Sequence, residues 1–397
     1  MTDLNDYRWL ISDAAVPWLQ KVADDLTGGA PTVGQIRALR SAVGIARASL
    51  LIEQAQLRSR ALEKFSQASE LFFTRQGLEQ ATDERLAAYK ATRFAGLGAV
   101  ADLCCGIGGD AMALALDRSI TLVDRDAISL LFDEANVRHC NGQTVTCLAE
   151  NVRGDHVREV DAWHLDPDRR TTGKRTSRVE LGEPGIETIE ALRTQCAAGA
   201  IKLAPAADVP EEWSAAGERE WIETRGECRQ QMIWLGELAD APSTRTATLI
   251  DDAGEACSFS SALVATLPLA GQVQRYLLDP SPSLVAAKML GSLATALELG
   301  GLSSQSPYLT AEEAVVHPHL QCFEIEAELP LDVRKLKAHL QARCIGRLEI
   351  KKRGIDITPE TLRPQLQLSG DNAATLILAK LGDAARAFVC RRSGNDK

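Results

Sequence analysis

Two hydrophobic periodicities divide the chain. Up to residue 92, apolar positions recur every three to four residues, as in Ile36, Leu39, Val43 and Ala46, which predicts amphipathic helices. From residue 99 the pattern changes to short apolar runs that alternate with helix-like segments, and this alternation predicts a parallel sheet with crossover helices. The predicted strands are 99–103, 120–123, 145–148, 162–165, 200–203, 221–224 and 246–250. We therefore expect an α/β fold with a seven-stranded sheet behind a helical N-terminal region.

The expected helices begin and end at ordinary signals. Pro31-Thr32 precedes a long helix, and Gly77 breaks the stretch 72–94 before a second helix that is capped near Thr82. Further helices are expected at 110–117, 127–139, 186–196 and 283–299. The C-terminal part reads as strand 321–328, helix 333–342, strand 347–352, helix 358–366, strand 374–381 and strand 386–392.

These patterns predict four parts. They are a helical region at 1–92, a sheet domain at 93–270, a connecting segment at 271–322 and a small α+β domain at 323–397. A chain of 397 residues is too long for one ordinary domain. The acidic N-terminus lacks the plan of a signal peptide, and no run of eighteen apolar residues exists, so we expect a cytoplasmic protein without a membrane span.

Ten cysteines are scattered without any C-x-x-C pair, so neither a zinc module nor a disulfide framework is indicated, and we expect no metal. The net charge of −10 argues against a chain that coats nucleic acid everywhere. Residues 323–397, however, carry 14 Lys and Arg against 10 Asp and Glu, a net charge of +4. This basic part is either a docking surface for a phosphate-bearing substrate or an ordinary solvated face.

The first predicted strand ends in a glycine-rich turn, DLCCGIGGD at 102–110. Such a turn brings a ligand close to the backbone, and amides at the next helix N-terminus favour a carboxylate. Asp102, four residues before Gly106, can hold an ammonium group, so the pair suits the methionine part of S-adenosylmethionine. Dinucleotide folds place an apolar residue there. Gly106-x-Gly108-x-x-Ala111 still satisfies their fingerprint, so nicotinamide binding remains an alternative.

Acids also follow the second and third strands. Asp124 can accept hydrogen bonds from a ribose diol, although it could instead cap a helix. Glu150 can accept one from an adenine amino group, although it could be a loop acid that faces water. Signals at consecutive strand ends favour an S-adenosylmethionine site in a Rossmann-like sheet. The neighbours grouped with this site are Cys104, Asp110, Arg125 and Asn151.

Asp166-Pro167-Asp168 follows the fourth strand, where open α/β sheets bind ligands, and we expect these residues to be catalytic. Methyl transfer is an in-line displacement, so positioning of the acceptor carries most of the catalysis. Asp168 and Arg169 depart from the Asp/Asn-Pro-Pro-aromatic motif of amino methyltransferases, which disfavours exocyclic amines as acceptors. No cysteine lies nearby for attack on a pyrimidine ring.

Several basic residues are candidates for substrate binding. Arg169 and Arg170 could grip phosphates or pair with nearby glutamates. Lys202, in an apolar strand, either faces the substrate or snorkels at an edge, and His164 is expected to be a packed core residue. In the C-terminal part, Lys351, Lys352 and Arg353 could contact an RNA backbone or form a solvated turn.

The chain resembles the class I S-adenosylmethionine-dependent methyltransferases through DLCCGIGGD, VDRD and LDPDRR. More narrowly, it resembles a group of bacterial proteins assigned as RNA methyltransferases that carry a C-terminal THUMP-like domain. The resemblance extends from about residue 40 to 392. Four patches support the narrower match: FFTRQGLEQAT at 72–82, LDPDRR at 165–170, IKLAPAAD at 201–208 and LEIKKRGIDITPETLRPQL at 348–366.

The resemblance implies RNA as the substrate and S-adenosylmethionine as the cofactor. By kinship, Asp102, Gly106 and Gly108 surround the methionine part, Asp124 meets the ribose and Glu150 the adenine. Three alternatives remain open: a methyltransferase for proteins or small molecules, a non-catalytic binding protein, and a nicotinamide-dependent oxidoreductase. The sequence does not indicate an oligomeric state.

Overall fold

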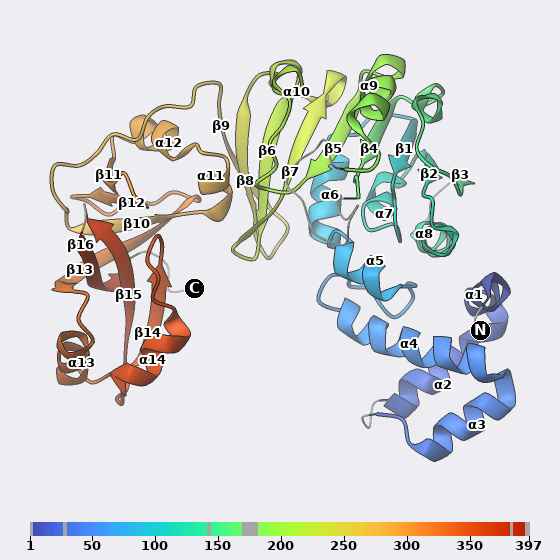
Figure 1. Cartoon of the computed structure of the whole chain (residues 1–397), viewed down its shortest axis with the longest axis horizontal. Helices are drawn as coiled ribbons and strands as arrows, with labels where there is room; N and C mark the ends of the chain where they lie inside the picture. The colour runs from blue at the N-terminus through green and yellow to red at the C-terminus, as the bar shows by residue number, and fades with distance from the viewer. Residues whose placement is uncertain (1–2, 27–29, 141–143, 169–181, 382–383, 394–397) are drawn as a thin grey trace. The chain divides into compact units, whose positions relative to one another are not determined.

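The computed structural model describes residues 3–26, 30–140, 144–168, 182–381 and 384–393 (Figure 1). The chain divides into two compact units. The first contains Met1–Arg219 and Gln230–Ser243, and the second contains Glu220–Arg229 and Thr244–Lys397. Among the described residues, no helix combines the length and apolar character that a membrane crossing needs.

Helices form the N-terminal part of the first unit. Their bounds are α1 Leu4–Leu10, α2 Val16–Leu26, α3 Val33–Val43, α4 Ile45–Ala61, α5 Arg75–Gln80 and α6 Glu84–Thr92. Thr32 caps α3, as the sequence predicts, and Gly44, with a φ of 89°, separates α3 from α4. The break predicted at Gly77 is wrong, because Gly77 lies inside α5. The two helices separate before Asp83, which caps α6.

The sheet of the first unit has a parallel centre. Its strands are β1 Ala99–Leu103, β2 Ser119–Val123, β3 Thr144–Leu148, β4 Ala162–Leu165, β5 Gly199–Leu203 and β7 Glu227–Leu235. The strand order is β3-β2-β1-β4-β5-β7, with β7 antiparallel to β5. The helices between these strands are α7 Ala111–Leu114, α8 Ala127–His139, α9 Ile186–Gln195 and α10 Glu211–Ala216.

The expected Rossmann-like sheet is present, but its strands differ from the predicted set. The sequence reading missed β7, whose first half, ECRQQ, is polar although Gln230 and Gln231 are buried. Next to β7 in the strand order is β6 Glu218–Thr224. The predicted seventh strand at 246–250 is β8 Arg245–Ile250, which belongs to the second unit and pairs there with β9 Ala256–Ser261.

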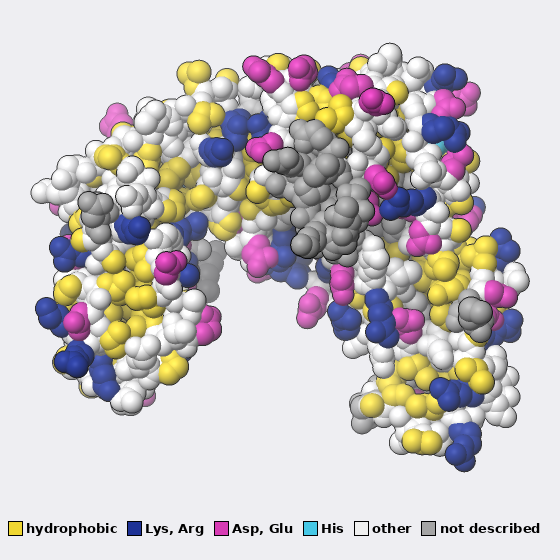
Figure 2. Space-filling model, viewed as in Figure 1, with side chains coloured by type: hydrophobic (Ala, Val, Ile, Leu, Met, Phe, Trp, Pro, Cys, Tyr) yellow, Lys and Arg dark blue, Asp and Glu magenta, His cyan; other side chains and the backbone are white. Residues whose placement is uncertain are grey.

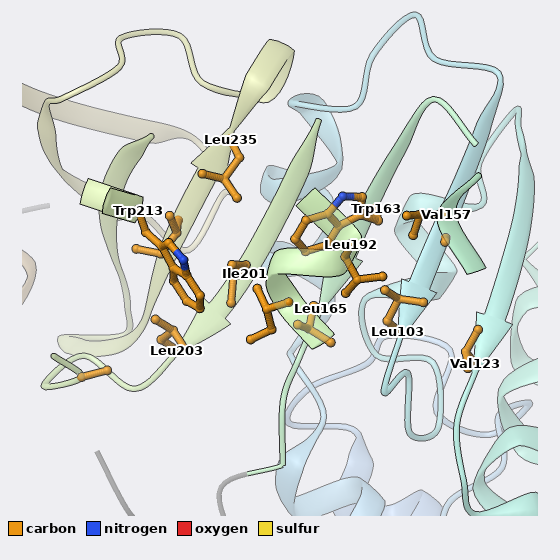
Figure 3. Packing of buried hydrophobic residues seen from close by; sticks show 14 residues of the cluster. Leu103, Val123, Val157, Trp163, Leu165, Leu192, Ile201, Leu203, Trp213 and Leu235 are labelled. Carbon is orange, nitrogen blue, oxygen red and sulfur yellow. The ribbon is translucent and has the colours of Figure 1, made fainter. Parts of the chain in front are cut away.

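One face of this sheet is a continuous apolar core (Figure 3). Trp163 and Leu165 of β4 pack there with Leu192 of α9, and all three are fully buried. Gly199 makes room for Trp163, because a side-chain carbon at residue 199 would lie 2.3 Å from the indole ring. The apolar residues of the parallel strands therefore hold α9 against the sheet.

The second unit contains a seven-stranded sheet in the order β11-β12-β10-β13-β16-β15-β14. The segment 271–322, expected to be a connection, supplies three of these strands, because Leu277, Leu278 and Leu309 bury their side chains in cores of this unit. The strands are β10 Tyr276–Pro280, β11 Gly300–Ser303, β12 Ser306–Ala311, β13 Leu320–Pro330, β14 Ile345–Lys352, β15 Asn372–Leu381 and β16 Ala384–Arg392.

Four helices accompany this sheet: α11 Pro282–Ala286, α12 Leu290–Ala296, α13 Val333–Ala342 and α14 Pro359–Leu366. The single helix predicted at 283–299 is divided into α11 and α12, because Lys288 has a φ of 56°, which no α-helix accommodates. Leu336 of α13 and Leu362 of α14 are buried in one core with Leu376 of β15. The C-terminal helices and strands therefore share a core of their own.

Candidate active site

The carboxyl ends of five strands meet at one edge of the first sheet. The register aligns Leu103 with Val123 and Leu165, Val123 with Leu148, and Leu165 with Ile201. Four of the strands therefore end at the same level, and β5 continues to Leu203. The residues that follow these positions are Cys104, Asp124, Ala149, Asp166 and Lys202.

The glycine-rich turn opens toward this edge. Cys104, Gly106 and Gly108 have φ values of 57°, 61° and 88°. The amide of Gly106 donates to Asp124 Oδ2 at 2.9 Å, and a side-chain carbon at residue 106 would meet nothing within 4 Å. A side-chain carbon at residue 108 would instead lie 2.2 Å from Asp133 Oδ1. The turn is thus open at Gly106 and closely packed at Gly108.

Helix α8 supports the turn through two buried polar residues that sequence reasoning missed. Asn136 donates to the carbonyls of Ile107 at 2.9 Å and Phe72 at 3.0 Å, and accepts from the amide of Phe72. Asp133 is fully buried, and burial raises its pKa well above the usual value. Two polar side chains three residues apart on the inner face of a helix were the available signal.

The distinctive segment at 72–82 packs against the other side of the turn. A side-chain carbon at Gly77 would lie 2.5 Å from Ile107, and one at Gly109 would lie 2.9 Å from the amide nitrogen of Thr82. Both glycines are required for this close approach. The segment therefore forms part of the wall around the turn.

Asp102 is almost completely buried, with 1% of its surface exposed. Its Oδ1 lies 2.7 Å from Nδ1 of His164, its register partner on β4. Burial raises the pKa of Asp102, and the nearby His164 opposes this rise. Oδ2 has no hydrogen-bond partner among the described residues. An ammonium group at this oxygen would satisfy it, so the turn and Asp102 fit the methionine part of S-adenosylmethionine.

Asp124 stands at the end of β2, where a ribose is expected. It accepts from the amides of Gly106 and Asp126, the latter at 2.8 Å. Burial raises the pKa of Asp124, while these two amides oppose the rise. A carboxylate has about four lone-pair sites, so it can accept hydrogen bonds from a diol as well.

Two other predicted cofactor residues have partners of their own. Glu150 contacts Arg153 at 2.6 Å and His156 at 3.0 Å, and its hydrogen bonds with Arg153 and His156 lower its pKa. Arg125 pairs with Glu183 and, at 3.2 Å, with Asp168. Arg125, which was grouped with the cofactor site, therefore contacts Asp168 of the predicted substrate motif. Asn151 is exposed beside Glu150.

A buried network of charges lies behind the edge. Asp110 pairs with Lys90 of α6 at 2.5 Å and accepts from the Thr82 hydroxyl at 2.7 Å. Burial acts to raise the pKa of Asp110, but Lys90 and other cations hold it well below the usual range. Lys202 contacts Thr82 at 3.0 Å and Asp166 at 2.5 Å. Thr82 and Lys90 were missed because their contacts with Asp110 join segments twenty or more residues apart in the sequence.

The predicted substrate motif begins at this network. The amide of Asp166 donates to the carbonyl of Leu103 at 3.2 Å, and 27% of its side chain is exposed. Pro167 is buried, and Asp168 exchanges two backbone hydrogen bonds with Glu183. Arg169 and Arg170 lie outside the described residues. Within the described part of the chain, no group of three or more His, Cys, Asp or Glu could hold a metal ion.

The predicted RNA contacts of the second unit are held by its own groups. Lys351 and Arg353 each lie 3.0 Å from a carboxylate oxygen of Asp279 in β10. Lys352 donates to the carbonyl of Ile355 at 3.2 Å. Lys351 also lies 3.8 Å from Glu349, so two carboxylates face the three cations and this cluster retains positive charge.

Comparison with known proteins finds similarity to a THUMP-like domain and to methyltransferases. Residues 320–392 match the family described as THUMP domain-like. An uncharacterized S-adenosylmethionine-dependent methyltransferase of Mycobacterium tuberculosis, found in strains CDC 1551 / Oshkosh and ATCC 25618 / H37Rv, is 29% identical to this chain. The alignment covers 87% of this chain and 98% of the relative.

A solved structure has the same fold over its whole length. The crystal structure of a protein from Porphyromonas gingivalis W83 that is classed as a methyltransferase superposes with a TM-score of 0.77. It is 20% identical and covers 100% of both chains. The relatives, the fold and the open, acid-lined turn agree. The chain is an S-adenosylmethionine-dependent methyltransferase with a THUMP-like C-terminal domain.

Proposed function

We propose that this methyltransferase acts on RNA, with the acceptor held at Asp166. The observation that carries the proposal is the THUMP-like match at 320–392, since THUMP domains are associated with RNA-modifying enzymes. Its recognition surface would include Lys351, Lys352 and Arg353. With RNA as its substrate, the protein would act in the cytoplasm.

A second basic surface supports RNA as the partner. Residues 31–61, which contain α3 and α4, carry five arginines and one glutamate, although the whole chain has a net charge of −10. Arg37, Arg40 and Arg60 are exposed, and their side chains have no ion pair or hydrogen bond among the described residues. Figure 2 shows Lys and Arg side chains on this face of the N-terminal helices. Unpaired arginines are suited to phosphate oxygens.

In this proposal the cofactor lies along the edge of the first sheet. Asp102 Oδ2 holds the methionine ammonium, the amides near Gly106 meet the carboxylate, Asp124 holds the ribose, and Glu150 lies at the adenine end. S-adenosylmethionine, when bound, supplies a methyl group on a sulfonium. Asp166 and the carbonyl of Pro167 orient the acceptor, and the buried walls keep water away from the reacting atoms.

The test uses purified protein, S-adenosylmethionine with a labelled methyl group, and RNA and protein fractions from cells that lack the gene. We expect label in RNA and a loss of that label with Asp166→Ala. Label in protein alone would replace RNA by a protein substrate. The absence of label from both fractions, with the cofactor still bound, would favour a non-catalytic binding protein.

The arginine surface is tested with the same RNA fraction. Arg37→Glu with Arg40→Glu should weaken RNA binding and reduce its dependence on salt, because each lost phosphate contact lowers the salt slope by about 1. Asp24→Lys with Asp25→Lys, on α2, serves as a charge-altering control outside this surface. Equal RNA affinity for the arginine variant and the unaltered protein would remove this support.

A further inference from the structure

Lys202 is enclosed by groups of the first unit. Its ammonium lies 2.5 Å from Asp166 Oδ2, 3.0 Å from Thr82 Oγ1 and 3.7 Å from Asp110 Oδ2. Only 8% of its side chain is exposed. An ammonium has three donors. With these neighbours, Lys202 is not placed to reach out to a substrate phosphate, nor to snorkel at an edge.

The groups around Lys202 are themselves fixed. The Thr82 hydroxyl accepts from Lys202 and donates to Asp110, so the three residues form one directed chain of hydrogen bonds. Asp110 also pairs with the fully buried Lys90. Buried ionic groups with several partners have little freedom to reorient. Contacts with Thr82 and Asp110 therefore fix the position of the Lys202 ammonium, which also contacts Asp166.

Asp166 is the most exposed carboxylate of this chain of contacts. Its backbone amide is tied to Leu103, and Lys202 engages Oδ2. No second hydrogen bond to the Asp166 side chain is found among the described residues. The lysine thus fixes the carboxylate through one oxygen and leaves the other to accept a hydrogen bond. Small errors in the position of such a group reduce the rate of an in-line displacement strongly.

We propose that Lys202 is a positioning residue for methyl transfer: anchored by Thr82 and Asp110, it holds Asp166 in the orientation that receives the methyl acceptor. The inference rests on the proposed function, in which Asp166 faces the acceptor. Lys202 itself contacts neither RNA nor cofactor and takes no part in the exchange of bonds. Through Asp110, the last residue of the glycine-rich turn, the same contacts connect the cofactor edge with the acceptor edge.

A positioning lysine and a lysine that binds substrate differ in the kinetic constant that changes when the lysine is removed. A substrate-binding lysine would raise KM for RNA when it is removed, whereas a positioning lysine would lower kcat. Lys202→Met removes the charge and keeps most of the volume of the side chain. Lys202→Arg keeps the charge and offers a donor to Asp166. Lys21→Met, at an exposed position of α2, makes the same substitution away from the site and is the control.

The experiment measures S-adenosylhomocysteine affinity by calorimetry, and kcat and KM for methylation of the RNA fraction. We expect Lys202→Met to leave the cofactor affinity within about twofold and the KM for RNA nearly unchanged, while kcat falls about a hundredfold. Lys202→Arg should recover part of kcat, and Lys21→Met should match the unaltered protein. A raised KM with unchanged kcat, or no effect on either, would overturn the inference.

Two further outcomes remain decisive. If Lys202→Met does not fold, judged by circular dichroism, Thr82→Val replaces it; kcat should then fall about tenfold, with the same unchanged KM. Unchanged kcat in Thr82→Val would overturn the inference. If the unaltered protein methylates no RNA, the proposed function fails and this inference falls with it, whereas active unaltered protein with a fully active Lys202→Met removes the inference alone.

Discussion

The two faces of the first sheet are built from alternate residues of the same strands. Leu103, Leu165 and Ile201 point to one face, where they pack with other apolar residues. Their neighbours Asp102, His164 and Lys202 share the opposite face, because register pairs in parallel strands point the same way. All six residues are buried. Burial therefore does not distinguish these two sets of three residues, but polarity does.

The apolar and the charged residues contribute differently to stability and to function. The apolar face gains free energy from every buried carbon atom, whereas the polar face removes charges from water and recovers only part of that cost through ion pairs. A stable fold needs the apolar packing and could dispense with these buried charges. We infer that the charges at Asp102, Asp110 and Lys202 are retained for the chemistry at the adjoining edge.

The largest effect should come from breaking one ion pair of the polar face. Lys90→Met leaves the buried Asp110 without its nearest cation, so the free energy of unfolding should fall by about 3–5 kcal/mol. The double variant with Asp110→Asn should lose less than the sum of the two single variants. Urea unfolding of all four proteins gives this coupling, and additive losses would contradict the ion pair.

A truncation on the apolar face should reduce stability to a similar extent but leave the site intact. Leu165→Ala creates a cavity in the core, so the free energy of unfolding should fall by about 2–5 kcal/mol. The variant that remains folded should bind S-adenosylhomocysteine as the unaltered protein does. A large loss of affinity in calorimetry would show that the two faces are not separable.

Gly108→Ala should disturb the cofactor turn directly. The new carbon would lie 2.2 Å from Asp133 Oδ1 at a φ of 88°, so we expect weaker cofactor binding and a stability loss of about 1–3 kcal/mol. Gly96→Ala is the matched control, because Gly96 has a φ of 83° and open space around it. Equal cofactor affinities for the two variants would speak against a close-packed turn.

The smallest effect concerns pH. Burial raises the pKa of Asp133 in the folded chain, so the folded state holds its proton more tightly than the unfolded state. Its stabilising contribution is complete below the unfolded pKa of about 4 and is lost as pH rises toward the folded value. Between pH 5 and 6, Asp133→Asn should gain stability relative to the unaltered protein by at most about 1.4 kcal/mol. A difference that does not vary with pH in urea unfolding would contradict an acid with a raised pKa.

Regular elements could be predicted where one period dominates the sequence. The strand predicted at 99–103 and the helix predicted at 333–342 have the same bounds in the structure. β7 could not be found in this way, because its buried Gln230 and Gln231 interrupt the apolar pattern. Likewise, the predicted helix at 283–299 gave no sign of the interruption at Lys288.

The site was predictable only as far as strand ends reveal it. Asp102, Asp124 and Asp166 follow from their positions after apolar runs, and their roles toward cofactor and substrate stay predictions. Lys90 and Thr82 could not be found, because their contacts join segments twenty or more residues from Asp110 in the sequence. Lys202 was visible, but its partners, which decide what it does, were not.

Calorimetric titration with S-adenosylhomocysteine tests the central claim most directly: that the acids at the strand ends converge on this cofactor. The unaltered protein should bind it in preference to NAD, and Asp102→Asn and Asp124→Asn should each weaken binding about tenfold or more, the effect of losing a hydrogen bond to a charged or paired group. Unchanged affinity in both variants, or tighter binding of NAD, would contradict the account.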